Sequence, residues 1–148
     1  MLVIPLLGAQ AETLTGRVVS VADGDTVTVL DTTNTQHKIR VAGIDAPEKK
    51  QAFGNRSKEN LAELVAGKNV SVEWTKRDRY QRIVGKIMVA KPSCTAADCP
   101  KTVDAGLAQI RTGLAWWYEK YAKEQLPGDA AAYAARSAGQ GPDRGHVA

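Results

Sequence analysis

The stretch Ser20–Asp31, SVADGDTVTVLD, reads as the end of one strand, a tight turn and an alternating second strand. Asp23-Gly24 is a strong signal for a two-residue hairpin turn. Alternation then places Asp25, Val27 and Val29 on one face of the second strand. The turn accounts for Asp23, but a carboxylate at Asp25 falls inside the start of a strand, where burial without a partner is costly. We therefore expect a positively charged group or a cation beside Asp25.

Short β-rich stretches recur on both sides of this hairpin, with helical patterns between some of them. The pattern predicts strands over 14–21, 25–30, 36–44, 69–74 and 83–90 and helices over 55–67, 102–113 and 129–138. The side chains expected to face inward outside the hairpin are Ile39, Val41, Leu61, Leu64, Val65, Leu107 and Ile110, and Asp129 is the expected cap of the last helix. Five short strands with a helix after the third are what a small Greek-key barrel of the OB type requires. We predict an α+β fold that is mainly a five-stranded OB-fold barrel with three helices.

The composition is that of an ordinary globular domain. The chain has 148 residues, of which 43% are hydrophobic and 24% charged. Its formal net charge is +4, which is compatible with a polyanionic partner and equally with a solvated basic surface. No apolar run approaches the roughly 20 residues of a membrane span, so we expect no membrane segment.

The first residues, MLVIPLLGAQAET, combine an apolar segment with the triplet Ala9-Gln10-Ala11. That triplet fits the small-x-small site at which signal peptidase cuts, although no basic residue precedes the apolar run. We interpret 1–11 as a clipped signal peptide, 12–138 as the folded domain and 139–148 as a disordered tail. This interpretation predicts a periplasmic or secreted protein. The alternative is an apolar N-terminal strand or arm.

The two cysteines, Cys94 and Cys99, are separated by four residues, a spacing that permits a local disulfide in an oxidising compartment. A zinc site would need two further soft or imidazole ligands. The two histidines, His37 and His146, do not cluster with the cysteines in the sequence. The cysteines therefore favour a disulfide over a metal site.

Four pieces of the sequence carry chemistry: DGDT around Asp25, RVAGIDAPE with Arg40, Asp45 and Glu48, DRYQR with Arg82, and GLAWWY. Each alone has an ordinary explanation as a turn, a solvated strand face or a surface loop. Together, in this order and approximate spacing, they resemble the staphylococcal-nuclease (thermonuclease-like) family over about Leu14–Gln125. The resemblance implies an OB-fold barrel with three helices. It also implies Ca²⁺-dependent hydrolysis of DNA and RNA phosphodiesters that leaves 3′-phosphates.

The resemblance assigns a role to each matching position. Asp25 and Asp45 match the calcium carboxylates, and Ala46 occupies the position that offers a backbone carbonyl. Glu48 matches the acid proposed to activate water, and Arg40 and Arg82 match the arginines that bind phosphate. Arg79 and Tyr80 match positions where basic and aromatic residues meet a terminal phosphate or a base. The segment that lines the nucleotide pocket in the family supplies Trp117, Tyr118 and Tyr121.

These residue types suit phosphoryl hydrolysis. Ca²⁺ takes oxygen ligands and tolerates water, so two carboxylates, a carbonyl and a phosphate oxygen suffice. Guanidinium groups meet phosphate bidentately and stay charged, and a carboxylate near the attacking water can accept its proton. We expect a monomeric nuclease that prefers single strands and has no stable protein partner. The alternatives are an OB-fold module that binds single-stranded nucleic acid without cutting it and an accessory protein with a vestigial site.

Overall fold

The structure is a computed structural model, and it describes residues 11–48, 50–96, 98–118, 122–123, 125–126 and 128–140. The strands are β1 (Glu12–Asp23), β2 (Thr26–Asp31), β3 (Gln36–Val41), β4 (Ile44–Asp45), β5 (Asn69–Arg77), β6 (Ile83–Ala90), β7 (Lys101–Asp104) and β8 (Trp116–Trp117). The helices are α1 (Gly54–Val65), α2 (Ala105–Arg111) and α3 (Asp129–Gln140). Among these, no helix is both long and apolar enough to cross a membrane.

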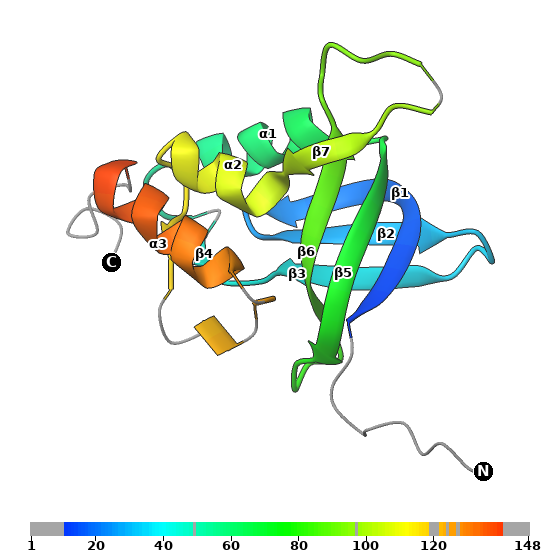
Figure 1. Ribbon diagram of the computed structural model, residues 1–148, viewed down its shortest axis with the longest axis horizontal. Helices are drawn as coiled ribbons and strands as arrows, with labels where there is room; N and C mark the ends of the chain where they lie inside the picture. Colours follow the sequence, from blue (N-terminus) through cyan, green and yellow to red (C-terminus); the bar gives the residue numbers. More distant parts are fainter. Residues whose placement is uncertain are drawn as a thin grey trace.

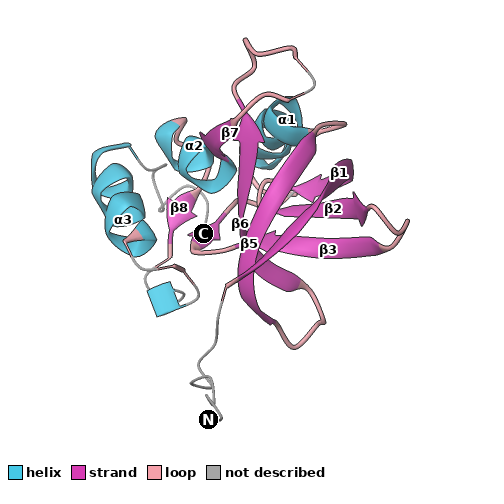
Figure 2. Ribbon diagram, turned by 45° about the vertical axis from the view of Figure 1, so that its right-hand side comes forward, coloured by secondary structure: helices cyan, strands magenta, loops and turns pink. Residues whose placement is uncertain are grey.

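Five strands form a closed barrel in the order β3-β2-β1-β5-β6, and a parallel pairing between β3 and β6 closes it. β7 pairs with the last residues of β6, Met88–Ala90, and β4 pairs with β8 in a separate two-stranded sheet. Figures 1 and 2 show the three helices gathered on one side of the barrel. The prediction of a five-stranded OB-type barrel with three helices is therefore confirmed.

β1 is long because it serves two neighbours. Its first half pairs with β5 and its second half with β2, and Gly16 belongs to both ladders. A Cβ atom at Gly16 would lie 2.4 Å from the carbonyl oxygen of Leu30, so only glycine allows the backbones to approach this closely. Two register shifts follow Gly16 in the β1–β2 ladder, and bulges of this kind increase strand curvature.

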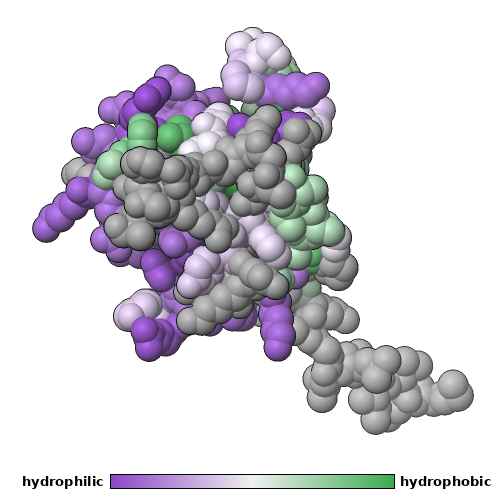
Figure 3. All heavy atoms as spheres, turned by 90° about the vertical axis from the view of Figure 1, so that its left-hand side faces the viewer, coloured by the Kyte–Doolittle hydropathy of each residue, from purple (hydrophilic) through white to green (hydrophobic). Residues whose placement is uncertain are grey.

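The core lies inside the barrel and beneath the helices. The inward positions predicted for the hairpin and for the third strand, Val27, Val29, Ile39 and Val41, are fully buried. The helices add buried side chains, namely Leu61, Val65 and Ile110, while Leu64 and Leu107 are partly buried against the same cluster. On the face seen in Figure 3, the described hydrophobic side chains form separate patches among hydrophilic and neutral ones.

The element boundaries differ from the sequence predictions in several places. The two residues that join β1 to β2 are Gly24 and Asp25, so Asp25 lies in the turn and not in the strand. The range 36–44 ends as a strand at Val41, and its last residue belongs to β4. The range 102–113 begins as strand β7 and becomes helical only at Ala105. α3 continues to Gln140, two residues past the predicted boundary of the folded domain, while residues 1–10 and 141–148 lie outside the described residues.

Asp129 is the first residue of α3, and its carboxylate accepts a hydrogen bond from Lys86 Nζ at 3.2 Å. The carboxylate predicted to cap the last helix therefore pairs with a barrel lysine, which ties α3 to β6.

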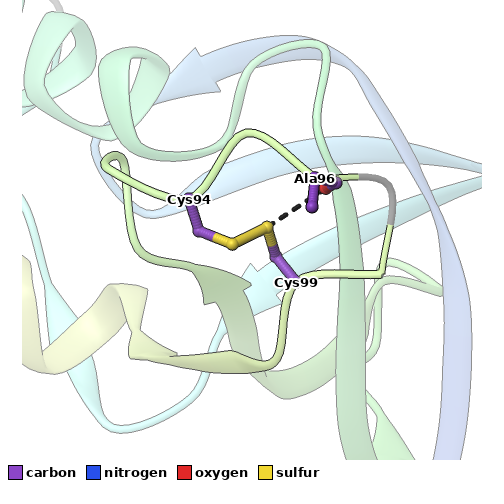
Figure 4. Close-up of a disulfide and its surroundings, with 3 residues drawn as sticks. All are labelled: Cys94, Ala96 and Cys99. Atoms are coloured by element: carbon purple, nitrogen blue, oxygen red, sulfur yellow. Dashed lines mark hydrogen bonds between the residues drawn. A yellow bond between two sulfur atoms is a disulfide. The ribbon is translucent and has the colours of Figure 1, made fainter.

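Cys94 and Cys99 form a disulfide that closes the loop between β6 and β7 (Figure 4). Cys99 Sγ lies 3.1 Å from the carbonyl oxygen of Ala96, a close contact of a sulfur that has no hydrogen to donate. The loop lies at the Ala90 end of β6, opposite to the end that begins at Ile83 (Figure 1).

Candidate active site

The carboxylate of Asp25 is held by neutral donors. Oδ1 accepts a hydrogen bond from Thr26 Oγ1 at 2.9 Å, and Oδ2 accepts one from the Ala46 N–H at 3.2 Å. The main-chain carbonyl of Asp25 accepts a bond from the Val41 N–H at 2.8 Å. These contacts join the turn to β3 and to the segment that follows β4.

Asp45 reaches the same place because β4 is fixed by a distant part of the chain. β4 pairs with β8, so that Ile44 faces Trp117 and Asp45 faces Trp116. The Tyr118 N–H extends this contact by donating to the carbonyl of Gly43 at 2.9 Å. The segment GLAWWY therefore holds the backbone that presents Asp45.

The half-buried carboxyl of Asp45 lies in a negative field. Burial raises its pKa above the ordinary value of an aspartate, and the negative charge of Asp25 raises the pKa further. The positive charge of Arg40 acts in the opposite direction, and Glu48 adds a smaller upward shift. Asp25 and Asp45 thus lie close enough to repel each other, and a bound cation would relieve this repulsion.

Arg40 lies on β3, opposite Thr26 of β2. Its guanidinium donates to the carbonyl of Val41 at 3.0 Å and to the carbonyl of Ile44 at 2.9 Å. These bonds bridge the end of β3 and the start of β4. The positive charge is thereby fixed beside the Asp25–Asp45 pair.

Glu48 lies at the exposed edge of this cluster. Its N–H donates to Gln51 Oε1 at 2.7 Å, and its carbonyl accepts from the Gln51 N–H at 2.8 Å, so the backbone here forms a tight turn. Within the described residues, no group of three or more His, Cys, Asp or Glu side chains converges in a way that could hold a metal ion. The structure brings Asp25 and Asp45 together and leaves Glu48 outside that pair.

The loop between β5 and β6 presents Arg82, Arg79 and Tyr80. Asp78 Oδ1 accepts from the N–H groups of Tyr80 and Arg82, and Asp78 Oδ2 accepts from Arg82 Nε at 2.7 Å. Burial alone would raise the pKa of Asp78, but the bonds from Arg82 and Tyr80 outweigh it and lower the pKa below its ordinary value. Asp78 therefore fixes both the loop and the Arg82 guanidinium.

Tyr80 is 64% exposed, and the guanidinium carbons of Arg79 and Arg82 lie 5.1 Å and 5.4 Å from its ring centroid. An exposed ring flanked by cations offers a face on which a base can stack while the guanidinium groups meet phosphate.

An open hollow of about 340 Å³ connects this loop to the β1–β2 turn. Its lining residues are Ala22, Asp23, Thr26, Lys38, Tyr80 and Arg82. Lys38 was not among the predicted site residues, although it alternates with Arg40 on the outward face of β3, and this alternation could have pointed to it.

Of the predicted aromatic residues of the last segment, Trp117 is half-buried against the core, and its Nε1 donates to Gln125 Oε1 at 3.0 Å. Tyr118 is half-buried next to it, and neither lines the hollow. Tyr121 lies outside the described residues.

The donor set fits a hard cation. Two carboxylates and the carbonyl of Ala46 are oxygen ligands of the kind that Ca²⁺ and Mg²⁺ prefer, whereas zinc favours nitrogen and sulfur. The mutual repulsion of Asp25 and Asp45 is the feature of this structure that such a cation would offset.

Comparison with known proteins identifies the family of the chain. The chain matches the family described as "Staphylococcal nuclease homologue" over residues 38–141. It is 38% identical over 127 residues to an "Uncharacterized endonuclease" of Haemophilus influenzae, an alignment that covers 85% of this chain and 65% of that protein. An "Uncharacterized endonuclease" of Escherichia coli is 42% identical over 106 residues, covering 72% of this chain and 62% of that protein. The "Micrococcal nuclease" of Shigella flexneri is 37% identical over 118 residues, covering 80% of this chain and 64% of that protein.

The chain spans less than two thirds of the length of each of these relatives. The family match covers most of the chain, including β4, the Arg82 loop and β8, and the chain belongs to the staphylococcal nuclease homologue family.

Proposed function

We propose that this chain hydrolyses phosphodiester bonds of DNA and RNA in a Ca²⁺-dependent reaction that leaves 3′-phosphates. The observation that carries the proposal is the half-buried pair of carboxylates, Asp25 and Asp45, held beside the guanidinium of Arg40. Placing two like charges together is unfavourable without a cation. The hydrogen bonds that Asp25 accepts from Thr26 and Ala46 come from neutral donors and add no positive charge to the pair.

In this proposal Asp25, Asp45 and the Ala46 carbonyl hold the Ca²⁺. The bound ion supplies positive charge against the charge that develops on the phosphate oxygens during hydrolysis. Arg40 and Arg82 bind the non-bridging oxygens of the phosphate and add to that stabilisation. Glu48, exposed at the edge of the pair, accepts the proton of the attacking water.

The exposed face of Tyr80 and the hollow beside it support a preference for single-stranded or frayed substrates, because unpaired bases can stack on an open ring. Trp117 and Tyr118 are half-buried, so in this proposal they act through the backbone contacts that hold β4 and Asp45. The disulfide between Cys94 and Cys99 supports a periplasmic or secreted location, since such bonds persist in oxidising compartments.

The test is digestion of a labelled oligothymidylate and of a matched duplex in Ca²⁺, in Mg²⁺ and in chelator. We expect cleavage in Ca²⁺, faster for the single strand, and products that gain a 3′-hydroxyl only after phosphatase treatment. Undiminished cleavage in chelator after metal removal would contradict the metal assignment. Tight binding of the oligonucleotide with no cleavage under any of the three conditions would support the alternative of a binding module.

A further inference from the structure

A group of buried polar side chains lies beneath the Gly24–Asp25 turn. Gln109 of α2 and Ser57 of α1 are both fully buried, each with a relative exposure of 0%. Sequence patterns place polar side chains on the solvent face of a helix, and neither residue belongs to the proposed chemistry. A fully buried amide must make its hydrogen bonds inside the protein, so its partners show what it does.

The amide of Gln109 connects α2, α1 and the turn. Its Nε2 donates to the Gly24 carbonyl at 2.8 Å and to the Ser57 carbonyl at 2.9 Å, and it lies 3.2 Å from Ser57 Oγ. Its Oε1 accepts a hydrogen bond from Asn60 Nδ2. Because the Gly24 and Ser57 carbonyls can only accept, the amide is oriented with its nitrogen toward them, which leaves Oε1 to accept from Asn60.

The two peptide groups on either side of the Asp25 Cα atom are therefore fixed from different directions. The Gly24 carbonyl, on the N-terminal side, is bound by Gln109, and the Asp25 carbonyl, on the C-terminal side, is bound by the Val41 N–H at 2.8 Å. An aspartate has only a short side chain, so the position of its carboxylate follows closely from its backbone. Gln109 thus helps to fix the backbone from which the Asp25 carboxylate extends.

The packing at Gly24 shows how tightly the same elements surround the turn. A Cβ atom at Gly24 would lie 1.8 Å from Ser57 Oγ and 3.0 Å from Ala46 Cβ. α1 and the segment after β4 therefore pack directly against the turn. Ser57 is itself anchored, since its Oγ donates to the Leu114 carbonyl at 2.8 Å.

We propose that Gln109 is a positioning residue that places the Asp25 carboxylate for metal binding, acting through the Gly24 carbonyl. This inference rests on the proposed function, because it takes Asp25 as a ligand of the Ca²⁺. Groups that orient metal ligands from behind typically affect metal affinity or activity about 10- to 100-fold when they are removed.

The test compares Gln109→Met with Tyr133→Phe. Methionine keeps the length of the glutamine side chain and removes every polar contact to Gly24 and Ser57. Tyr133→Phe is the control, because it removes a polar contact of another buried side chain, the hydrogen bond from Tyr133 Oη to Asp104 at 2.6 Å, while Asp104 still caps α2 through the Leu107 N–H. Both variants should melt at a lower temperature than the wild type.

Three measurements separate positioning from stability. We expect Gln109→Met to bind Ca²⁺ about 10- to 100-fold more weakly in a calorimetric titration. Its kcat, measured at a temperature well below its Tm, should fall by a similar factor. Hydrogen exchange of the Ala46 N–H, which donates to Asp25, should become faster. Binding of oligothymidylate in chelator should stay unchanged, since Arg82 and Tyr80 are untouched. Tyr133→Phe should change none of these values.

Wild-type calcium affinity, kcat and Ala46 exchange in folded Gln109→Met would overturn the inference. Should that variant fail to fold, Asn60→Ala, which removes the donor to Gln109 Oε1 and a 3.4 Å contact to Thr112 Oγ1, should give a smaller loss of calcium affinity. Wild-type affinity in that variant would equally overturn the inference. If the wild-type chain itself neither binds Ca²⁺ nor cleaves, the proposed function fails. Faster Ala46 exchange in Gln109→Met would then still report whether Gln109 fixes the turn.

Discussion

Asp25→Asn tests the metal-ligand role most directly, because it removes one charge at nearly constant shape. Asp25 accepts hydrogen bonds from Thr26 Oγ1 at 2.9 Å and from the Ala46 N–H at 3.2 Å. An asparagine can keep both contacts, since its Oδ1 accepts from Ala46 while its Nδ2 donates to the threonine hydroxyl, which can act in either role. Loss of charge assistance costs about 1 kcal/mol, and relief of the repulsion with Asp45 offsets this cost in the absence of calcium.

The fold should therefore hold while the function is lost. For a chain of 148 residues, 1 kcal/mol corresponds to roughly 2–4 °C in Tm, so we expect the Tm in chelator to stay within about 4 °C of the wild type. Calcium at 100 times its Kd stabilises the wild type by about 2.7 kcal/mol, or roughly 5–11 °C, and the same concentration should leave the variant unchanged. Cleavage should fall on the order of 10³-fold, since a bound ion contributes several kcal/mol and about 1.4 kcal/mol is a factor of ten.

Asp31→Asn is the matched control, because it makes the same change at the other end of β2. Hydrogen bonds from the His37 side chain, the Thr33 hydroxyl and the Thr35 N–H hold the pKa of Asp31 well below its ordinary value. This variant should lower the Tm and leave cleavage and calcium binding unchanged, the opposite of the pattern expected for Asp25→Asn. Wild-type cleavage and a wild-type calcium response in Asp25→Asn would refute the reasoning.

Three further predictions concern the groups around this pair. Arg82→Lys should lower kcat/KM by about 10- to 100-fold, because a lysine cannot bind Asp78 through Nε while meeting a phosphate in a planar fork; an unchanged kcat/KM in steady-state assays would argue against phosphate binding there. Asp78→Asn should lower the Tm at pH 7, and the difference from the wild type should shrink as the pH falls below about 4. The reason is that a carboxyl with a lowered pKa stabilises the fold above its unfolded pKa and loses that contribution on protonation. A difference in Tm that does not change with pH would contradict this. Reducing the bond between Cys94 and Cys99 should cost about 2 kcal/mol for so short a loop and should spare cleavage of short oligonucleotides, since the loop lies at the far end of β6; a parallel loss of cleavage would show that the loop contributes to the site.

Strand and helix periodicity predicted the strands of the barrel, and the resemblance to the staphylococcal-nuclease family predicted how they are arranged. The alternating valines of β2, Val27 and Val29, and the pair Ile39 and Val41 of β3 are buried as predicted, because each strand exposes one face to the core. α1 was predicted one residue late at its start and two residues long at its end, a difference typical of helix termini.

The sequence patterns did not predict the pairing of β4 with β8 or the strand β7. β4 and β8 are each two residues long and too short to show a period, and they pair across a wide gap in the chain. The pattern predicts a helix from residue 102 because TVDAGLAQI contains helical spacing from Ala105 onward, whereas pairing with β6 holds residues 101–104 as a strand. The sequence pattern does not single out Gln109, because a polar side chain on a short helix is expected to face solvent. Only the tertiary structure shows the Gly24 and Ser57 carbonyls that Gln109 binds.

Gly24, between Asp23 and Asp25, is likewise explained by tertiary contacts and not by the local sequence pattern. A turn explanation attributes Gly24 to a left-handed backbone, yet Gly24 is not among the described glycines with positive φ. What excludes a side chain at Gly24 is Ser57, whose Oγ occupies the space of a Cβ atom, together with Ala46. The motif DGD therefore combines three separate requirements: Asp23 pairs with Thr26 at the end of β1, Gly24 lets α1 approach, and the charge of Asp25 acts on Asp45. Only the first of these is local, which is why a hairpin rule accounts for one carboxylate and the arrangement of α1, α2 and β4 around the turn accounts for the other.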